Sequence, residues 1–465
     1  MRRTTLLALL AALAVAGWIA LFEREGGAGD EGHPVFGLDE PEIRAIEIER
    51  PGESAVRLAR DGEGFVVAEG DGPASAADAG EADLFLQNVV SLRFEREIEN
   101  VTGEDLPGFG LDPPGLLLRV FPESDDHPLT ARFGDETPAA GNRYLQLGER
   151  VLVTSAFARD NLDRSAWDLR DKRVFRLDMA AARRLRVSTG EGTTVEVARE
   201  EGVWNILRPY RFAADPYEAS QFASALLDAE MAGVAPPPDE GGEDPFGLAS
   251  PRLTAALDLV AGPREEAVSR TVHFGSESRT PPGVFARLGT DPLIFVVRKP
   301  LFDALREVAD NEMANLRSLD LFRFAAFRTV ALRFATPDGE STFHRREGGE
   351  GREWTMESGR AAPVVVDTVA VEDLLYELNS TEAEAVGEAS LPGDGAAWAI
   401  AVTEEVEEGG ETRETAPETV RLTVSASGEV RALRAGDDRT LVVSADAWKA
   451  IADLFVSAGV PPEGS

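Results

Sequence analysis

The sequence contains no cysteine among its 465 residues. This absence excludes disulfide bonds, thiolate catalysis, cysteine-ligated zinc, iron–sulfur clusters and a lipid-modified N-terminal cysteine. Lysine is almost absent as well, since the chain has only Lys172, Lys299 and Lys449 and every other basic residue is arginine. We attribute this bias to genome composition rather than to a recognition role for arginine.

Positive charge is scarce in the chain as a whole. There are 83 acidic and 47 basic side chains, which gives a net charge of −36 at pH 7, and the excess of acid is spread along the sequence. Such a field repels the phosphates of nucleic acids and anionic lipid head groups. Because no basic patch interrupts it, the sequence predicts that nucleic acid is not a partner.

The motifs that carry phosphate, nucleotide or hydrolase chemistry are missing. There is no GxxxxGK[ST] loop, no GxGxxG between a strand and a helix, and no GxSxG elbow. The four histidines form no HxxxH or HExxH spacing on a helix; they are His33, His127, His273 and His344. The sequence therefore predicts no catalytic, cofactor-binding or metal-binding residue and a chain that is not an enzyme. A Ser-His-Asp site assembled only in space stays open.

Two acidic stretches, 240–244 and 403–418, are candidates for cation binding. Both lack the alternating ligands and the bidentate glutamate of a calcium loop. They are typical of solvated turns, and the second is expected at the tip of a hairpin.

The first residues carry a long apolar run. Residues 4–22, TTLLALLAALAVAGWIALF, are uncharged and long enough, as a helix, to cross a bilayer. Arg2 and Arg3 precede the run and favour a cytoplasmic N-terminus. We therefore predict a single-pass anchor in the inner membrane, with the bulk of the chain extracytoplasmic or periplasmic. The alternative is a signal peptide cleaved after the small-x-small triplet at 14–16, although WIALF keeps the segment apolar beyond that triplet.

One phrase occurs twice at a distance. FGLDPPGLLLRVF, from Phe109, returns as FGLASPRLTAALDLV from Phe246, and the residues around it recur too. Entry segments begin at Phe36, Phe175 and Phe322, a spacing that matches a domain and far exceeds the roughly 20 to 50 residues of a solenoid repeat. The sequence thus predicts three tandem copies of one unit.

Each copy has the same predicted order of elements. Alternating strands separated by glycine-containing turns lead to an aromatic residue, which is Phe65, Trp204 or Trp354. An amphipathic helix follows, most clearly in the third copy, where the apolar stripe is Val371, Leu374, Leu375 and Leu378. A strand pair aligned as LTARFGDE, RTVHFGSE and VRALRAGDD comes later, and a strand-to-helix segment then aligns Phe157, Phe302 and Trp448 as core aromatics.

These patterns predict an α+β fold of three units, each a mostly antiparallel sheet covered by helices, after one N-terminal transmembrane helix. The predicted domains are an anchor and linker (1–34), unit 1 (35–174), unit 2 (175–321) and a degenerate unit 3 (322–465). Units 1 and 2 end in hand-over segments, LRDKRVFRLD (169–178) and LRSLDLFRFA (316–325), that also open the next unit. Unit 3 ends in VPPEGS, which is expected of a terminal unit.

The chain resembles the DUF4340 family of bacterial proteins. The resemblance rests on FGLDPP, RFGDETPAAGNRYLQL, VLVTSAFARDNLD and LRDKRVFRLD, and it covers nearly all of residues 35–465, with the third copy weakest. It implies an N-terminally anchored envelope protein, of a kind often encoded beside ABC-transporter components linked to gliding motility. It brings no catalytic residues with it.

We therefore expect a membrane-anchored accessory or docking protein of an ABC-transporter-type envelope complex, with permease or ATPase subunits as partners. Tyr210 and Tyr217, which flank RFAADP, are the candidate partner-binding pair. One alternative is an envelope hydrolase or polysaccharide-processing enzyme with carboxylates between units, which requires a deep cleft. Another is an architectural spacer, which would expose no apolar patch.

Overall fold

The structure is a computed structural model that describes residues 32–125, 127–138, 141–175, 182–200, 202–236, 244–259, 268–311, 313–348, 351–359, 362–393, 395–408 and 411–460. The predicted anchor at 4–22 lies outside the described residues. None of the helices in the described ranges is long and apolar enough to cross a membrane.

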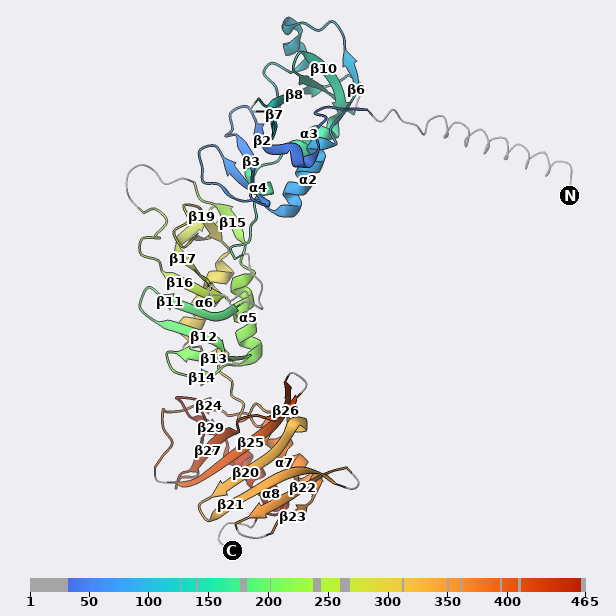
Figure 1. The fold of residues 1–465 in the computed structure, drawn as a ribbon. Coiled ribbons are helices and arrows are strands. Elements are labelled where there is room, and N and C mark those ends of the chain that lie inside the picture. Colours follow the sequence, from blue (N-terminus) through green and yellow to red (C-terminus); the bar gives the residue numbers. More distant parts are fainter. Residues whose placement is uncertain are drawn as a thin grey trace, which may run out of the picture. The chain divides into compact units, whose positions relative to one another are not determined.

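The chain divides into two compact units. One consists of Met1–Lys172 with Ala235–Pro237, and the other of Arg173–Val234 with Pro238–Ser465. The first holds one β-sheet and the second holds two, so three sheets follow one another along the chain (Figure 1). We call these the first, second and third sheets.

The first sheet is antiparallel throughout. Its order is β1-β6-β10-β9-β8-β7-β2-β3-β4-β5. The strands are β1 (His33–Pro34), β2 (Ile43–Glu49), β3 (Val56–Asp61), β4 (Gly64–Glu69), β5 (Ser75–Ala76), β6 (Arg93–Ile98), β7 (Leu116–Pro122), β8 (Leu129–Glu136), β9 (Asn142–Leu147) and β10 (Arg150–Ser155).

The second sheet is also antiparallel, in the order β14-β13-β12-β11-β16-β17-β18-β19-β15. The strands are β11 (Ala182–Thr189), β12 (Thr194–Glu200), β13 (Val203–Arg208), β14 (Phe212–Ala213), β15 (Met231–Val234), β16 (Leu253–Leu259), β17 (Val268–Arg279), β18 (Pro282–Leu288) and β19 (Ile294–Val297).

The third sheet has the order β23-β22-β21-β20-β25-β27-β28-β29-β24, with β26 paired to the end of β25. The strands are β20 (Thr329–Thr336), β21 (Gly339–Gly348), β22 (Gly351–Ser358), β23 (Val364–Val366), β24 (Ala385–Val386), β25 (Ala396–Glu408), β26 (Glu411–Glu414), β27 (Glu418–Val424), β28 (Val430–Arg434) and β29 (Leu441–Val443). The β25–β26 pair confirms the hairpin predicted within 403–418.

The three sheets share one topology. The first sheet, read as β5-β4-β3-β2-β7-β8-β9-β10-β6, corresponds strand for strand and in the same chain order to the second sheet read from β14 and to the third sheet read from β23. The prediction of an α+β fold with three mostly antiparallel sheets is therefore confirmed. The limits of three separate domains stay a prediction, since the second and third sheets fall in one compact unit.

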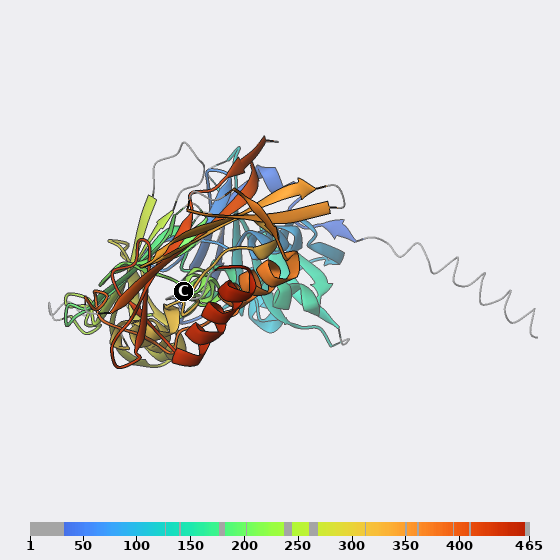
Figure 2. The same ribbon diagram turned by 90° about the horizontal axis from the view of Figure 1, so that it is seen from below.

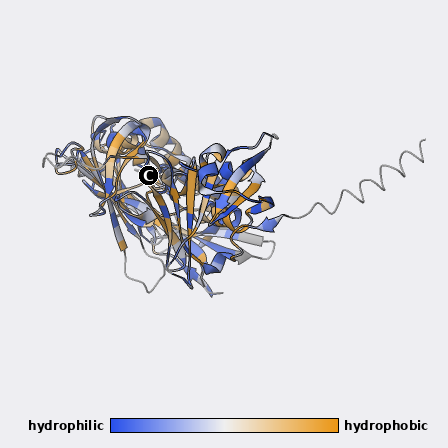
Figure 3. Cartoon of the chain, turned by 90° about the horizontal axis from the view of Figure 1, so that it is seen from above, coloured by the Kyte–Doolittle hydropathy of each residue, from blue (hydrophilic) through white to orange (hydrophobic). Residues whose placement is uncertain are grey.

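Alternating side chains explain why these segments form half-buried strands. On β7 every second residue, Leu116, Leu118 and Val120, is buried, and the residues between them are half-buried. Figure 3 shows apolar and polar residues interleaved along the strands in the same way. Burying one face of each sheet then requires helices to cover it.

The helices after β5, β14 and β23 supply that cover. They are α2 (Ala79–Val90), α5 (Pro216–Leu227) and α7 (Thr368–Ser380). The predicted stripe of α7, from Val371 to Leu378, is buried, and so are Phe222 and Leu226 of α5. Each helix begins after an aspartate whose carboxylate accepts a hydrogen bond from a first-turn N–H, namely Asp78, Asp215 and Asp367.

A second set of helices follows β10, β19 and β29. It consists of α3 (Ala156–Leu162), α6 (Lys299–Asp310) and α8 (Ala445–Ser457), and the short α4 (Ala166–Leu169) comes after α3. In the third sheet α8 lies beside α7 on one face (Figure 2), where the ring of Phe455 stacks on Phe334 at a centroid distance of 3.8 Å. Trp448 of α8 meets Trp398 of β25 at 5.2 Å.

One predicted core aromatic is wrong. Phe157 is 72% exposed, whereas Phe302 and Trp448 are buried. Phe302 and Trp448 are each the fourth residue of their helix, whereas Phe157 is the second residue of α3. Because residues two apart on a helix face different directions, Phe157 points away from the core.

The alignment of the third copy was also wrong by one strand. LTARFGDE lies on β8 and RTVHFGSE on β17, and the strand in the matching place of the third sheet is β27. VRALRAGDD instead covers β28 and the turn after it. The long hairpin arm that extends β25 separates β27 from β25 in sequence, and this insertion displaced the alignment.

The repeated phrase forms a turn, as predicted. Gly110 and Gly247 have φ angles of 66° and 68°, in the left-handed region that favours glycine. The carbonyl oxygen of the preceding phenylalanine faces a second glycine, Gly134 or Gly275, where an added Cβ would collide with it. FGL and the later FG therefore recur together because they pack against each other.

Candidate interaction surface

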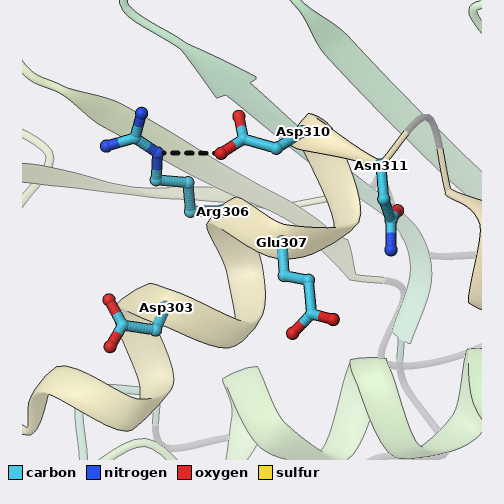
Figure 4. Close-up of a pocket in the computed structure, with 5 residues that line it drawn as sticks. All are labelled: Asp303, Arg306, Glu307, Asp310 and Asn311. Carbon is cyan, nitrogen blue, oxygen red and sulfur yellow. Dashed lines mark hydrogen bonds and ion pairs between the residues drawn. The ribbon is translucent and has the colours of Figure 1, made fainter.

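A charged groove and a neighbouring cavity lie along helix α6 of the second sheet. The first, of about 340 Å³, is lined by Asp303, Arg306, Glu307, Asp310 and Asn311 (Figure 4). All five side chains come from α6 and the residue after it, and Arg306 donates to Asp310 at 3.0 Å. Small-molecule sites are lined mostly by hydrophobic and aromatic side chains, whereas every side chain lining this groove is charged or an amide.

Two further cavities also lack the features of a catalytic or small-molecule site. One of about 480 Å³ shares Arg306 and Asp310 and adds Glu191, Arg252 and the turns around them. Another of about 230 Å³ lies beside Trp204. Among the described residues no group of three or more histidine, aspartate or glutamate side chains could hold a metal ion.

Several groups with a shifted pKa lie where the second and third sheets meet in the larger compact unit. Arg434, 3% exposed, donates to Asp437 at 2.7 Å and to the carbonyl oxygens of Asp320 and Ser318 at 2.7 and 3.1 Å. Burial raises the pKa of Asp437 and lowers that of Arg434, so desolvation outweighs their mutual attraction. Burial also raises the pKa of Glu418, whose carboxylate accepts from the Arg323 N–H.

This cluster joins the two sheets instead of forming a cleft. Asp437 accepts from the Ala213 N–H at 2.9 Å, and Asp438 accepts from the Arg211 N–H at 2.7 Å. Neither Asp437 nor Glu418 lines any of the three cavities described above. Asp437 and Asp438 thus fix the turn between β28 and β29 to the entry of β14.

Tyr210, one of the two candidate partner-binding residues, belongs to this junction. Its half-buried ring lies 5.0 Å from the guanidinium of Arg439 and 5.9 Å from that of Arg317, and it meets Phe212 edge to face. Two cations over one ring stabilise the contact between the sheets.

Tyr217, the other candidate, is 67% exposed in the first turn of α5. Its hydroxyl accepts from Gln221 one helical turn later, at 3.1 Å. Among the described residues the two tyrosine rings make no contact with each other. A role for either in partner binding stays a prediction.

Exposed apolar side chains gather on the third sheet. The described chain has eleven large hydrophobic residues in this class, and six of them belong to the third sheet and its helices: Phe327, Val364, Val365, Val369, Tyr376 and Val456. Single exposed hydrophobic residues are ordinary, but neighbouring ones mark interaction sites.

Four of these residues lie close together in the sequence, on β23 and on the helix that follows it. Val364 and Val365, 51% and 68% exposed, form β23 at the edge of the sheet, and the chain passes directly from β23 into α7. Val369 and Tyr376, 62% and 72% exposed, lie seven residues apart on one face of α7. We call Val364, Val365, Val369 and Tyr376 the β23–α7 surface.

Sequence reasoning missed the β23–α7 surface. The run Val364-Val365-Val366 is a strand signal three residues long, and a run of this length does not reveal whether its strand is central or at an edge. Val369 and Tyr376 fall off the apolar stripe of α7, which was a usable sign that this helix has a second apolar face.

The family model described as a domain of unknown function, DUF4340, matches residues 70–245 and 204–397. Because the two overlapping matches span most of the chain, this protein belongs to the DUF4340 family. No curated protein matches the sequence.

Proposed function

We propose that this protein is a non-enzymatic, membrane-anchored extracytoplasmic docking protein of an ABC-transporter-type envelope complex. The observation that carries the proposal is the β23–α7 surface, where an edge strand and the helix directly after it both expose large apolar side chains. Anchoring rests on the apolar run at residues 4–22, and the transporter association rests on the family resemblance.

The two alternatives have less support. A hydrolase acting with carboxylates between units needs those carboxylates in a cleft, whereas the two buried carboxylates of raised pKa, Asp437 and Glu418, bind backbone N–H groups and Arg434. An architectural spacer does not require exposed valines on a sheet edge, and such an edge promotes aggregation by pairing with other chains.

Affinity purification tests the proposal. The full chain, with residues 1–34 intact, is purified from membranes of its native bacterium in mild detergent, and co-purifying proteins are identified by mass spectrometry. We expect permease or ATPase subunits with the wild type, and their loss from a Val365→Arg/Val369→Arg variant. Val268→Arg, at a residue of the second sheet that is 49% exposed, is the matched control and should retain them. Recovery of the wild-type chain alone in several detergents would contradict the proposal.

A further inference from the structure

The edge strand of the first sheet is covered by an added strand. The Asp78 N–H donates to the Leu169 carbonyl at 2.9 Å, and the Asp171 N–H donates to the Ala76 carbonyl at 3.0 Å. These bonds join β5 antiparallel to the start of the first hand-over segment, at the bridge between Ala77 and Arg170.

The second sheet repeats this arrangement. The Asp215 N–H donates to the Leu316 carbonyl at 2.8 Å, and the Ser318 N–H donates to the Ala213 carbonyl at 3.0 Å. Arg317 forms the matching bridge. In both sheets the covering segment is Leu-Arg followed by a short polar residue, and its leucine is 0% or 2% exposed.

The third sheet presents the same edge. Val366 pairs with Trp354, just as Ala77 and Ala214 pair through their N–H groups with the carbonyls of Phe65 and Trp204. Val365 C=O and Asp367 N–H therefore take the places of the edge groups that bind the hand-over segments. Within the described ranges neither group has a hydrogen-bond partner, and β23 ends the sheet.

The chain's own continuation does not reproduce the covering segment. The hydrogen bonds that close α8, from the N–H groups of Ala458 and Val460, match those that close α6, from Asn311 and Met313. The residues that follow, PPEGS (461–465), lie outside the described residues and include no leucine or arginine. In the described structure each hand-over segment is already paired with a sheet of its own chain.

Charge favours an arginine in the incoming segment. The chain carries a net charge of −36. Glu372 and Asp373 are exposed on α7, the helix that directly follows β23. In the first sheet the arginine of the covering segment, Arg170, is attracted by the carboxylate of Glu69. An arginine in the incoming segment would meet a similar field at β23.

We infer that the open edge of β23 binds an extended segment of another protein, with a leucine followed by an arginine, as an added antiparallel strand. The segment replaces, in the third sheet, the hand-over strand of the other two. Main-chain hydrogen bonds to Val365 and Asp367 supply affinity, and the leucine supplies specificity. This inference rests on the proposed docking function and names the form of the partner.

A peptide of residues 312–321, which contains residues 316–321 of the second hand-over segment, is the probe. Its binding to the purified full chain is measured by fluorescence anisotropy. We expect saturable binding, weakened at least tenfold by Val365→Arg in the chain and unchanged by Val268→Arg. A peptide with Ser318→Pro lacks the N–H that Val365 would accept and should also bind at least tenfold more weakly.

Three results would overturn the inference. The first is no saturable binding, or equal binding to the Val365→Arg chain. The second is a tenfold gain in peptide affinity when residues 461–465 are removed, because the chain's own tail would then occupy the edge. The third is a wild-type dimer that Val365→Arg dissociates, because a second copy would then be the partner.

Different experimental results would contradict the strand-addition site and the proposed docking function. If the peptide binds as expected but no transporter subunit is recovered, the strand-addition site stands and the proposed role falls. If transporter subunits still bind the Val365→Arg/Val369→Arg variant, docking stands and this site is wrong.

Discussion

Single residues explain why the FGL phrase and the later FG pair recur together. At Gly275 a Cβ would collide with the carbonyl oxygen of Phe246, which itself accepts from the Ser276 N–H at 2.7 Å. Backbone on both sides leaves little room for relief, so only glycine fits. The same contact joins Phe109 to Gly134 in the first sheet.

We predict that Gly275→Ala destabilises the larger compact unit by about 1–3 kcal/mol, the usual range for overpacking. The free energy of unfolding is measured by urea denaturation. Gly339→Ala is the control, because nothing lies within 4 Å of a Cβ at that position. An equal, small effect of both substitutions would show that the turn does not depend on this contact.

Glu418 makes stability depend on pH. Burial raises its pKa in the folded state, so folding favours the protonated form. The stabilisation is complete below the ordinary glutamate pKa of 4.5 and is lost as the pH rises through the raised value. Stability of the larger compact unit should therefore fall as the pH increases across this window.

Glu418→Gln should flatten that pH dependence. The glutamine amide oxygen still accepts from the Arg323 N–H, and no charge is buried at neutral pH. Thermal unfolding between pH 4.5 and pH 8 measures the slope, with the exposed Glu411→Gln as the control. An unchanged slope would show that Glu418 does not cause the pH dependence of stability.

At the scale of elements, the outer edges of β14 and β23 differ in their partners. The Ala213 N–H donates to Asp437 at 2.9 Å, and the equivalent Val365 N–H faces outward from an uncovered edge. Proline is tolerated on an edge strand only where its missing N–H has no partner.

We therefore predict that Ala213→Pro costs about 1–3 kcal/mol, because a buried acceptor loses its donor. Val365→Pro should cost less than about 1 kcal/mol, since only a solvent-facing N–H is removed. Denaturant unfolding of the two variants gives the comparison. A larger cost at Val365 than at Ala213 would indicate that the third edge is already paired.

Much of each unit follows from local pattern. The buried stripe of α7 and the caps of α2 and α5 depend on residues close together in sequence, so the sequence predicts them. Phe157 was misplaced because a shift of two residues on a helix changes which face a side chain occupies. VRALRAGDD was misaligned because an insertion in β25 is invisible to strand alternation.

The candidate site could not be predicted for a different reason. Whether β23 is covered depends on hydrogen bonds to a segment that, in the first two sheets, lies roughly a hundred residues further along the chain. Tyr210 shows the same limit, because Arg439 and Arg317 reach its ring from distant parts of the sequence. Alternation identifies strands and helices but not which edge stays open.

At the scale of the whole molecule, the apolar run at residues 4–22 decides whether the protein stays in the membrane or is released from it. A helix of this length gives effectively irreversible insertion. We predict that the full chain stays in the membrane pellet after an alkaline wash and that a chain beginning at residue 35 appears in the supernatant. Mature protein beginning at Gly17, found by N-terminal sequencing, would instead establish the cleaved signal peptide.

The most direct test of the account is amide hydrogen exchange at three equivalent residues. Asp78 and Asp215 donate to the hand-over leucines at 2.9 and 2.8 Å, and Asp367 has no described acceptor. We expect the Asp367 amide to exchange at least tenfold faster than the other two, and to slow when the 312–321 peptide is added. Equal protection of all three amides in the free protein would contradict the claim that the third edge is open.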